Sequence, residues 1–170
     1  TANASPAEEL LSEVPAGAPT LVYADLAAIR ASTFYQQRPD KGPITMPDRD
    51  YADFVQATGF DFEKDLDRVV IASWPAGFIQ GQGNQGQKKT VVVAEGRFDR
   101  RKIRDYAMRK GKVDRQEGHD VFLFSTGNQA VQAGWNSITF LDDHRIGIVE
   151  GSSIAPLLVH PAENPAADPA

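Results

Sequence analysis

Apolar and polar positions along the chain follow two patterns, one typical of strands and one typical of helices. Short runs rich in valine, isoleucine and aromatic residues are typical of strands, and we expect strands at 20–24, 68–74, 90–97, 121–124, 137–141 and 146–149. Apolar residues three and four positions apart predict helices that begin near Pro6, Asp48 and Arg100. Shorter helices are expected from Asp25 to Ile29 and after Ser152.

Start and stop residues mark the ends of these elements. Ser5 is placed to cap the first helix, and Glu8 stands where a capping box needs an acid. A later helix begins after Asp99 and ends at Gly111, the residue types that favour a helix start and a helix stop. Residues 142–145 predict a tight turn between the last two strands.

The order of these elements predicts the fold class. Strand, helix, strand, strand, helix and strand in succession is the order of the ferredoxin-like split βαβ fold, an α+β two-layer sandwich, here with an added C-terminal β-hairpin. We expect residues 1–19 to form an N-terminal helix and lead-in, and residues 20–160 to form the α+β domain. Residues 161–170 lack core-forming side chains and are expected to be a tail or linker.

The central strands carry apolar side chains on both faces of the predicted sheet. Val69 and Ile71 lie on one face, whereas Val70, Ala72 and Trp74 lie on the other. A two-layer sandwich with one wetted face would show polar residues at every second position instead. We therefore expect the face opposite the helices to be covered by the extra hairpin, the N-terminal helix, another domain or a second copy.

Composition narrows the classes of function. The chain has 170 residues, a net charge of −5 and no cysteine, which argues against a nucleic-acid-binding surface and excludes disulfides and thiolate chemistry. No apolar run approaches the roughly 20 residues of a transmembrane helix. The cysteine-free composition and the small, polar N-terminal segment suit an exported protein, periplasmic or associated with the cell envelope.

Three segments, at 57–72, 21–26 and 94–99, resemble a family of uncharacterised exported bacterial proteins. The similarity runs from about the first strand to the last hairpin. It implies an α+β domain that is often followed by a related second domain. It implies no catalytic residues, because the family has no established activity to transfer.

Candidate metal ligands lie in two predicted turns. His119 and Asp120 form one pair, and Asp142, Asp143 and His144 form a second group that could meet the first in space and hold a divalent ion. Aspartates are also common in turns because their side chains bond to nearby backbone, and this interpretation is favoured. We therefore expect no metal site and no cofactor.

Other polar patterns have structural explanations. Residues 81–86 match G-x-G-x-x-G, but a valine-rich strand follows instead of a helix, which favours a plain connection. The basic residues between Arg97 and Lys112 are interpreted as the solvated face of a helix. The hydroxyl groups near strand ends have no catalytic base beside them in the sequence; they belong to Ser125, Thr126, Ser152 and Ser153. The two tryptophans, Trp74 and Trp135, are explained by packing.

Taken together, these features favour a non-enzymatic exported domain that acts through contact with another domain, a subunit or an envelope protein. The alternative is a sensor that binds a small molecule or ion on the second face of the sheet. A hydrolase is the least favoured of the three, because no set of nucleophile, base and oxyanion donors is present in the pattern.

Overall fold

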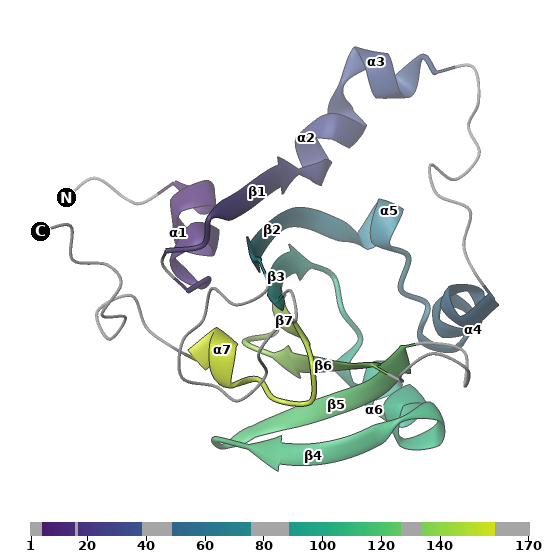
Figure 1. Ribbon diagram of the computed structural model, residues 1–170. Coiled ribbons are helices and arrows are strands. Elements are labelled where there is room, and N and C mark those ends of the chain that lie inside the picture. The colour runs from purple at the N-terminus through teal and green to yellow at the C-terminus, as the bar shows by residue number, and fades with distance from the viewer. Residues whose placement is uncertain (1–4, 16, 39–48, 76–88, 127–133, 159–170) are drawn as a thin grey trace, which may run out of the picture.

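One antiparallel sheet of seven strands organises the computed structural model, which describes residues 5–15, 17–38, 49–75, 89–126 and 134–158 (Figure 1). The strands are β1 (Thr20–Asp25), β2 (Leu66–Trp74), β3 (Lys89–Gly96), β4 (Lys112–Gln116), β5 (His119–Thr126), β6 (Gly134–Phe140) and β7 (Arg145–Glu150). The helices are α1 (Pro6–Ser12), α2 (Leu26–Ala31), α3 (Thr33–Gln36), α4 (Arg49–Thr58), α5 (Phe62–Asp65), α6 (Arg100–Lys110) and α7 (Ala155–Leu158). The α+β class is confirmed.

The six expected strands are all present, and a seventh was missed. β4 carries a single apolar residue, Val113, among Lys112, Asp114, Arg115 and Gln116, so it shows no apolar signal. It pairs with β5 through a two-residue hairpin loop at 117–118 and forms one end of the sheet. Edge strands with charged side chains are a common way to protect a sheet end, and this explains the weak pattern.

The strand order is β1-β2-β3-β7-β6-β5-β4, and the ferredoxin-like topology is not confirmed. A split βαβ unit needs the two strands joined by a helix to run parallel with another strand between them. Here β1 and β2, which the helices α2 to α5 connect, are adjacent and antiparallel. The unforeseen β4 changes the second half as well, because α6 leads to the far edge of the sheet and not directly to β5.

Two meanders make up this order, and a single strand pair joins them. β1, β2 and β3 form the first, and β7, β6, β5 and β4 form the second. The join is the antiparallel pair β3–β7, in which Val91 faces Val149 and Ala94 faces Ile146. Every residue of this pairing comes from segments far apart in the sequence.

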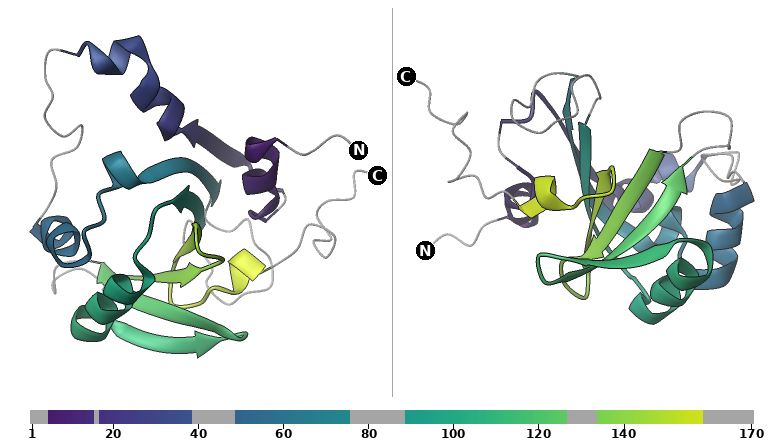
Figure 2. Two further views of the ribbon diagram at one scale, coloured as in Figure 1. Left: turned by 180° about the vertical axis from the view of Figure 1, so that it is seen from behind. Right: turned by 60° about the horizontal axis from the view of Figure 1, so that its bottom comes forward.

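Helices α4 and α6 cover one face of the sheet, lying side by side in both views of Figure 2. α6 begins at the expected cap, where the Asp99 side chain accepts from Lys102 N at 3.0 Å, and its apolar stripe of Ile103, Tyr106 and Ala107 is buried. α4 joins it through an edge-to-face contact between Phe54 and Tyr106, with ring centroids 5.2 Å apart. The core on this side also contains Ala94, Phe122, Phe140 and Ile146.

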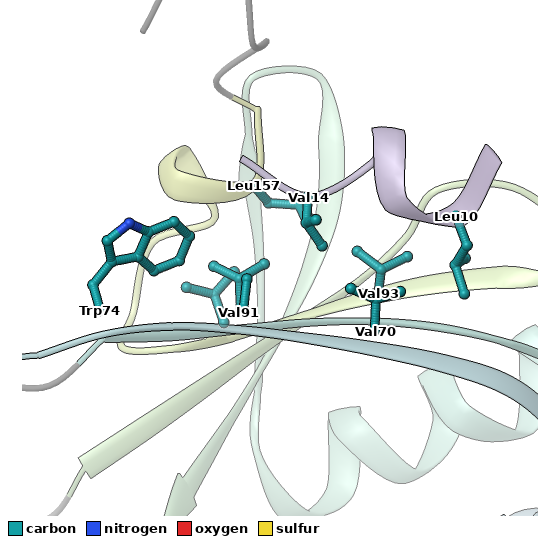
Figure 3. Packing of buried hydrophobic residues seen from close by; sticks show 9 residues of the cluster. Leu10, Val14, Val70, Trp74, Val91, Val93 and Leu157 are labelled. Carbon is teal, nitrogen blue, oxygen red and sulfur yellow. The ribbon is translucent and has the colours of Figure 1, made fainter. Parts of the chain in front are cut away.

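The N-terminal helix and the last helix cover the second face, as Figure 3 shows. Leu10 and Val14 from the α1 segment and Leu157 from α7 point down onto Val70, Val91, Val93 and Trp74 of the sheet. The α1 helix begins as expected, because Ser5 and Glu8 form a capping box. The expectation of a covered second face is therefore confirmed, and the chain supplies the cover itself.

Beyond β1 the chain leaves the sheet in a projecting segment, α2 followed by α3 (Figure 1). Asp25 caps α2 by accepting from Ala28 N at 2.8 Å, and Ser32 caps α3 by accepting from Tyr35 N at 3.3 Å. Arg30 fastens this segment to the start of β2: its guanidinium donates to Glu63 O, Leu66 O and the Asp67 carboxylate. A second short helix, α3, therefore follows α2 directly after Ser32.

Candidate functional site

The two turns that carry His119, Asp120, Asp142, Asp143 and His144 lie at the same end of the strands β4 to β7, beside the start of α6. The β4–β5 turn is closed by Glu117 and Gly118, with φ angles of 49° and 85°, so both central residues are left-handed. This turn places Arg115 on one side and His119 and Asp120 on the other. Because β5 and β6 are antiparallel neighbours, Asp120 lies close to the end of β6, where its carbonyl accepts from Thr139 Oγ1 at 3.0 Å.

The β6–β7 turn uses Asp142 for its own closure. The Asp142 carboxylate accepts from His144 N at 2.7 Å, Arg145 N at 2.8 Å and Arg145 Nε at 2.6 Å. Partial burial acts to raise the pKa of Asp142, but these hydrogen bonds outweigh it and hold the pKa below its ordinary value. Asp142 is therefore a turn-forming residue, and its oxygens are already occupied.

Arginines from α6 and β4 stand beside the other two aspartates. Arg100 Nη1 lies 2.9 Å from Asp143 Oδ1, whereas Asp120 lies between Arg104 and Arg115 at 3.8 Å and 3.4 Å. Across the residues that the structure describes, no group of three or more histidines and acids is placed to hold a metal ion. The two turns do approach one another, but positively charged guanidiniums lie among their carboxylates.

A pocket of about 420 Å³ opens among these arginines. Its lining consists of Arg100, Arg101, Arg104, Arg115, Gly118, His119, Asp120, Phe122 and Phe140. The Arg100 guanidinium lies 4.8 Å from the centre of the Phe140 ring, a cation–π contact that fixes its position. The sequence predicted that the arginines of α6 lie on a solvated helix face, and they are exposed. Three of them, Arg100, Arg101 and Arg104, also form one wall of this pocket.

A second hollow, of about 590 Å³, lies next to the first and shares Arg100 with it. Its walls come from the α4–α5 connection and the residues before α6, with Phe60 stacked on Phe98 at 5.1 Å. Both signs of charge line it, with Asp65, Asp99 and Asp143 beside Arg97, Arg100 and Lys102. This balance favours neither cations nor anions.

A different kind of surface lies at the opposite end of the sheet, along β1. Leu21, Val22 and Tyr23 are 50%, 48% and 37% exposed, although Val70 of the adjacent strand β2 is fully buried. From the strand register, Leu21 and Tyr23 lie on the face of α1, whereas Val22 lies on the face of α6. The sequence predicted this strand but carried no sign that it would lie at the edge.

The remaining sequence candidates are explained locally or fall outside the described residues. Trp74 packs in the core, as expected, and Ser153 accepts from Ala155 N at 3.2 Å just before α7. Ser152 offers its carbonyl to the Gln116 side chain. The G-x-G-x-x-G segment, His160 and the tail lie outside the described part of the chain, as do the side chains of Ser125, Thr126 and Trp135.

Two features of the pocket were not predicted from the sequence. Arg115 was missed because β4 was not foreseen, and the aromatic wall formed by Phe122 and Phe140 was missed as well. The pairing of a basic helix start with a polar hairpin would have been the signal for the pocket. Among the helices described, none is long and apolar enough to cross a bilayer. No model of a known protein family, no curated protein and no solved structure matches the chain, so the family resemblance stays a prediction.

Proposed function

We propose that this chain is a non-enzymatic contact domain that adds an extended segment of another polypeptide to the outer edge of β1. The observation that carries the proposal is the difference between the two ends of the sheet. Within the described part of the chain, β1 pairs with β2 alone, so its outer edge presents a row of backbone N–H and C=O groups. Along this edge Leu21, Val22 and Tyr23 are uncharged and between 37% and 50% exposed.

The opposite edge is built differently. β4 is mostly charged: Lys112, Asp114 and Arg115 lie around its single apolar residue, Val113, which is 38% exposed. Charges on an edge strand discourage pairing with another chain, because an incoming strand would have to desolvate them. The sheet is therefore protected at β4 and open at β1.

Strand addition would satisfy the backbone groups of β1 and cover its side chains at the same time. Full burial of a valine or leucine side chain contributes roughly 1.5–3 kcal/mol, and each of the half-exposed residues on β1 has about half of this to gain. Because apolar side chains lie on both faces of β1, the matching segment has apolar residues at successive positions. We therefore commit to an extended, largely uncharged strand as the occupant.

The projecting α2–α3 segment widens this surface. It continues directly from β1 and carries Ile29, which is 47% exposed, and Phe34, which is 89% exposed. Arg30 holds the segment to β2, so these side chains are presented from a fixed base. Exposed apolar side chains on a strand edge and on the helices that follow it offer more area than the single scattered residues common on monomers.

Because the second face of the sheet is covered, the proposed contact with another polypeptide rests on the β1 edge and not on that face. Apolar residues on both faces of the sheet no longer argue for a partner, because α1 and α7 already cover β2, β3 and β7. The same cover disfavours a ligand on that face. The exported location stays part of the proposal, and fractionation of cells that express the full-length protein tests it.

Matched edge variants test the contact. We compare Val22→Lys on β1 with Val113→Lys on β4, two exposed valines at opposite ends of the sheet. In the full-length protein, a photoreactive residue placed at 22 should crosslink to a polypeptide in the native cells, whereas one at 113 should not. The mass of the adduct distinguishes a second copy from a different protein.

For a second copy, light scattering on the purified chain should show a concentration-dependent mass that Val22→Lys abolishes and Val113→Lys preserves. For a different protein, Val22→Lys should abolish co-purification of the crosslinked partner. Equal crosslinking from both positions, or none from position 22, refutes the proposal. Circular dichroism of both variants confirms that the fold is retained.

A further inference from the structure

The arginine-lined pocket beside α6 has a shape and charge that suit a ligand, and nothing in the contact proposal uses it. We propose that this pocket binds a small phosphorylated molecule, with its phosphoryl group between Arg101, Arg104 and Arg115. The volume, about 420 Å³, lies in the range of small-molecule sites. The pocket lies at the end of the sheet opposite β1, so the two proposals are independent.

Positive charge dominates the lining of this pocket. Four arginines line the pocket and Asp120 is the single carboxylate among the lining residues, in a chain whose net charge is −5. Like charges gathered in a concave surface repel one another, and their field is focused there. An anion with more than one negative charge relieves this repulsion.

The arginines of the pocket also have unfilled hydrogen-bonding capacity. Asp120 lies 3.8 Å from Arg104 and 3.4 Å from Arg115, longer than the roughly 2.7–2.9 Å of a strong charge-assisted bond. Arg101 has no hydrogen-bond or ion-pair partner within the described part of the chain. Arg115 also donates to Gly118 O at 3.2 Å. Each guanidinium carries five donors, however, so most of the donors on these three arginines do not bond to protein.

Arginines from two elements line the same pocket: Arg101 and Arg104 come from α6, whereas Arg115 comes from β4. A phosphoryl group has three outer oxygens and a charge of about −1.5 to −2, and so can accept from several guanidinium forks at once. A single carboxylate would neutralise fewer of these charges, so a phosphoryl group is the better match.

Arg100 has a different role in this arrangement. It is held by Asp143 at 2.9 Å and by the Phe140 ring, so it forms a fixed wall. Phe140 and Phe122 also line the pocket, and the parts of these rings that remain exposed offer an apolar surface for the organic part of the ligand. The site therefore favours a phosphate ester with a compact apolar group over inorganic phosphate.

Titration of the purified full chain tests this inference, with inorganic phosphate and phenyl phosphate as probes. At low salt, chemical shifts of α6 and β5 amides should saturate for both probes, with tighter binding of phenyl phosphate. Arg104→Ala and Arg115→Ala should each weaken binding about tenfold, the usual effect of losing a charge-assisted contact of about 1.4 kcal/mol. Arg109→Ala, on the last turn of the same helix, is the matched control and should leave binding unchanged.

Asp120→Asn supplies an opposite expectation. It removes the one carboxylate in the lining while keeping the side-chain size, so phosphate binding should tighten several-fold. No saturation by about 10 mM probe, equal weakening by Arg109→Ala, or weaker binding in Asp120→Asn each overturns the inference. None of these results depends on the state of the β1 edge.

Discussion

Truncation of Leu10 tests whether α1 is an integral layer of the fold. Leu10 is 0% exposed and packs with Val14 against Val70 and Val93 on the second face of the sheet. Leu10→Ala removes three carbon atoms, which at about 0.8 kcal/mol each gives roughly 2.4 kcal/mol of lost transfer free energy. The cavity adds to this, so we expect the free energy of unfolding to fall by about 2–5 kcal/mol.

Urea unfolding, followed by tryptophan fluorescence and by circular dichroism, measures this loss. Leu11→Ala is the matched control, because Leu11 is on the same helix but only partly buried, and it should cost about half as much or less. Coincident transitions by the two probes are needed to read a single free energy. If Leu10→Ala costs under about 1 kcal/mol, or no more than Leu11→Ala, α1 does not cover the sheet and the assignment of the second layer is wrong.

Three further variants probe the backbone, the projecting segment and the β6–β7 turn. Gly96→Ala should destabilise the chain by about 2 kcal/mol or more in thermal unfolding, because the new Cβ would lie 2.2 Å from Asp65 O; an unchanged melting temperature would contradict this. Arg30→Ala should cost about 1–3 kcal/mol and speed proteolytic cleavage within 26–38, whereas an unaltered cleavage pattern would show that the arginine does not hold the segment. The pKa of Asp142 is lowered in the folded chain, so its stabilising effect is present at neutral pH and is lost as the pH falls below about 4 through the folded-state pKa. Asp142→Asn should therefore be less stable than the wild type at pH 7, with the gap closing in acid; a gap independent of pH would refute the role of the charge.

Local signals in the sequence predicted the strong elements well. Asp99 and Gly111 bound α6, and Ser5 with Glu8 starts α1, because a cap is decided by a few neighbouring residues. Apolar residues at successive positions in β2 correctly indicated a sheet buried on both faces. These are properties of short segments, which the sequence displays directly.

Long-range pairing was harder to predict. Val113 alone could not mark β4 as a strand, because the rest of that segment is polar as an exposed edge requires. Nothing in residues 20–25 distinguishes an edge strand from a central one, so the sequence did not indicate that β1 lies at the edge of the sheet. The arginine pocket needs α6, β4, β5 and β6 together, and it could not be foreseen while β4 was missing.

The pairing of β3 with β7 has a consequence for how the chain is made. Until β7 and α7 leave the ribosome, β3 has no neighbour on that side, and α1 alone lies over the valines of the first meander. Nascent chains therefore expose the unpaired edge of β3 and its apolar side chains for a time. The sheet is completed only when two segments distant in the sequence meet, which slows folding. A chain shortened before Arg145 would leave this edge of β3 permanently unpaired, a state prone to aggregate.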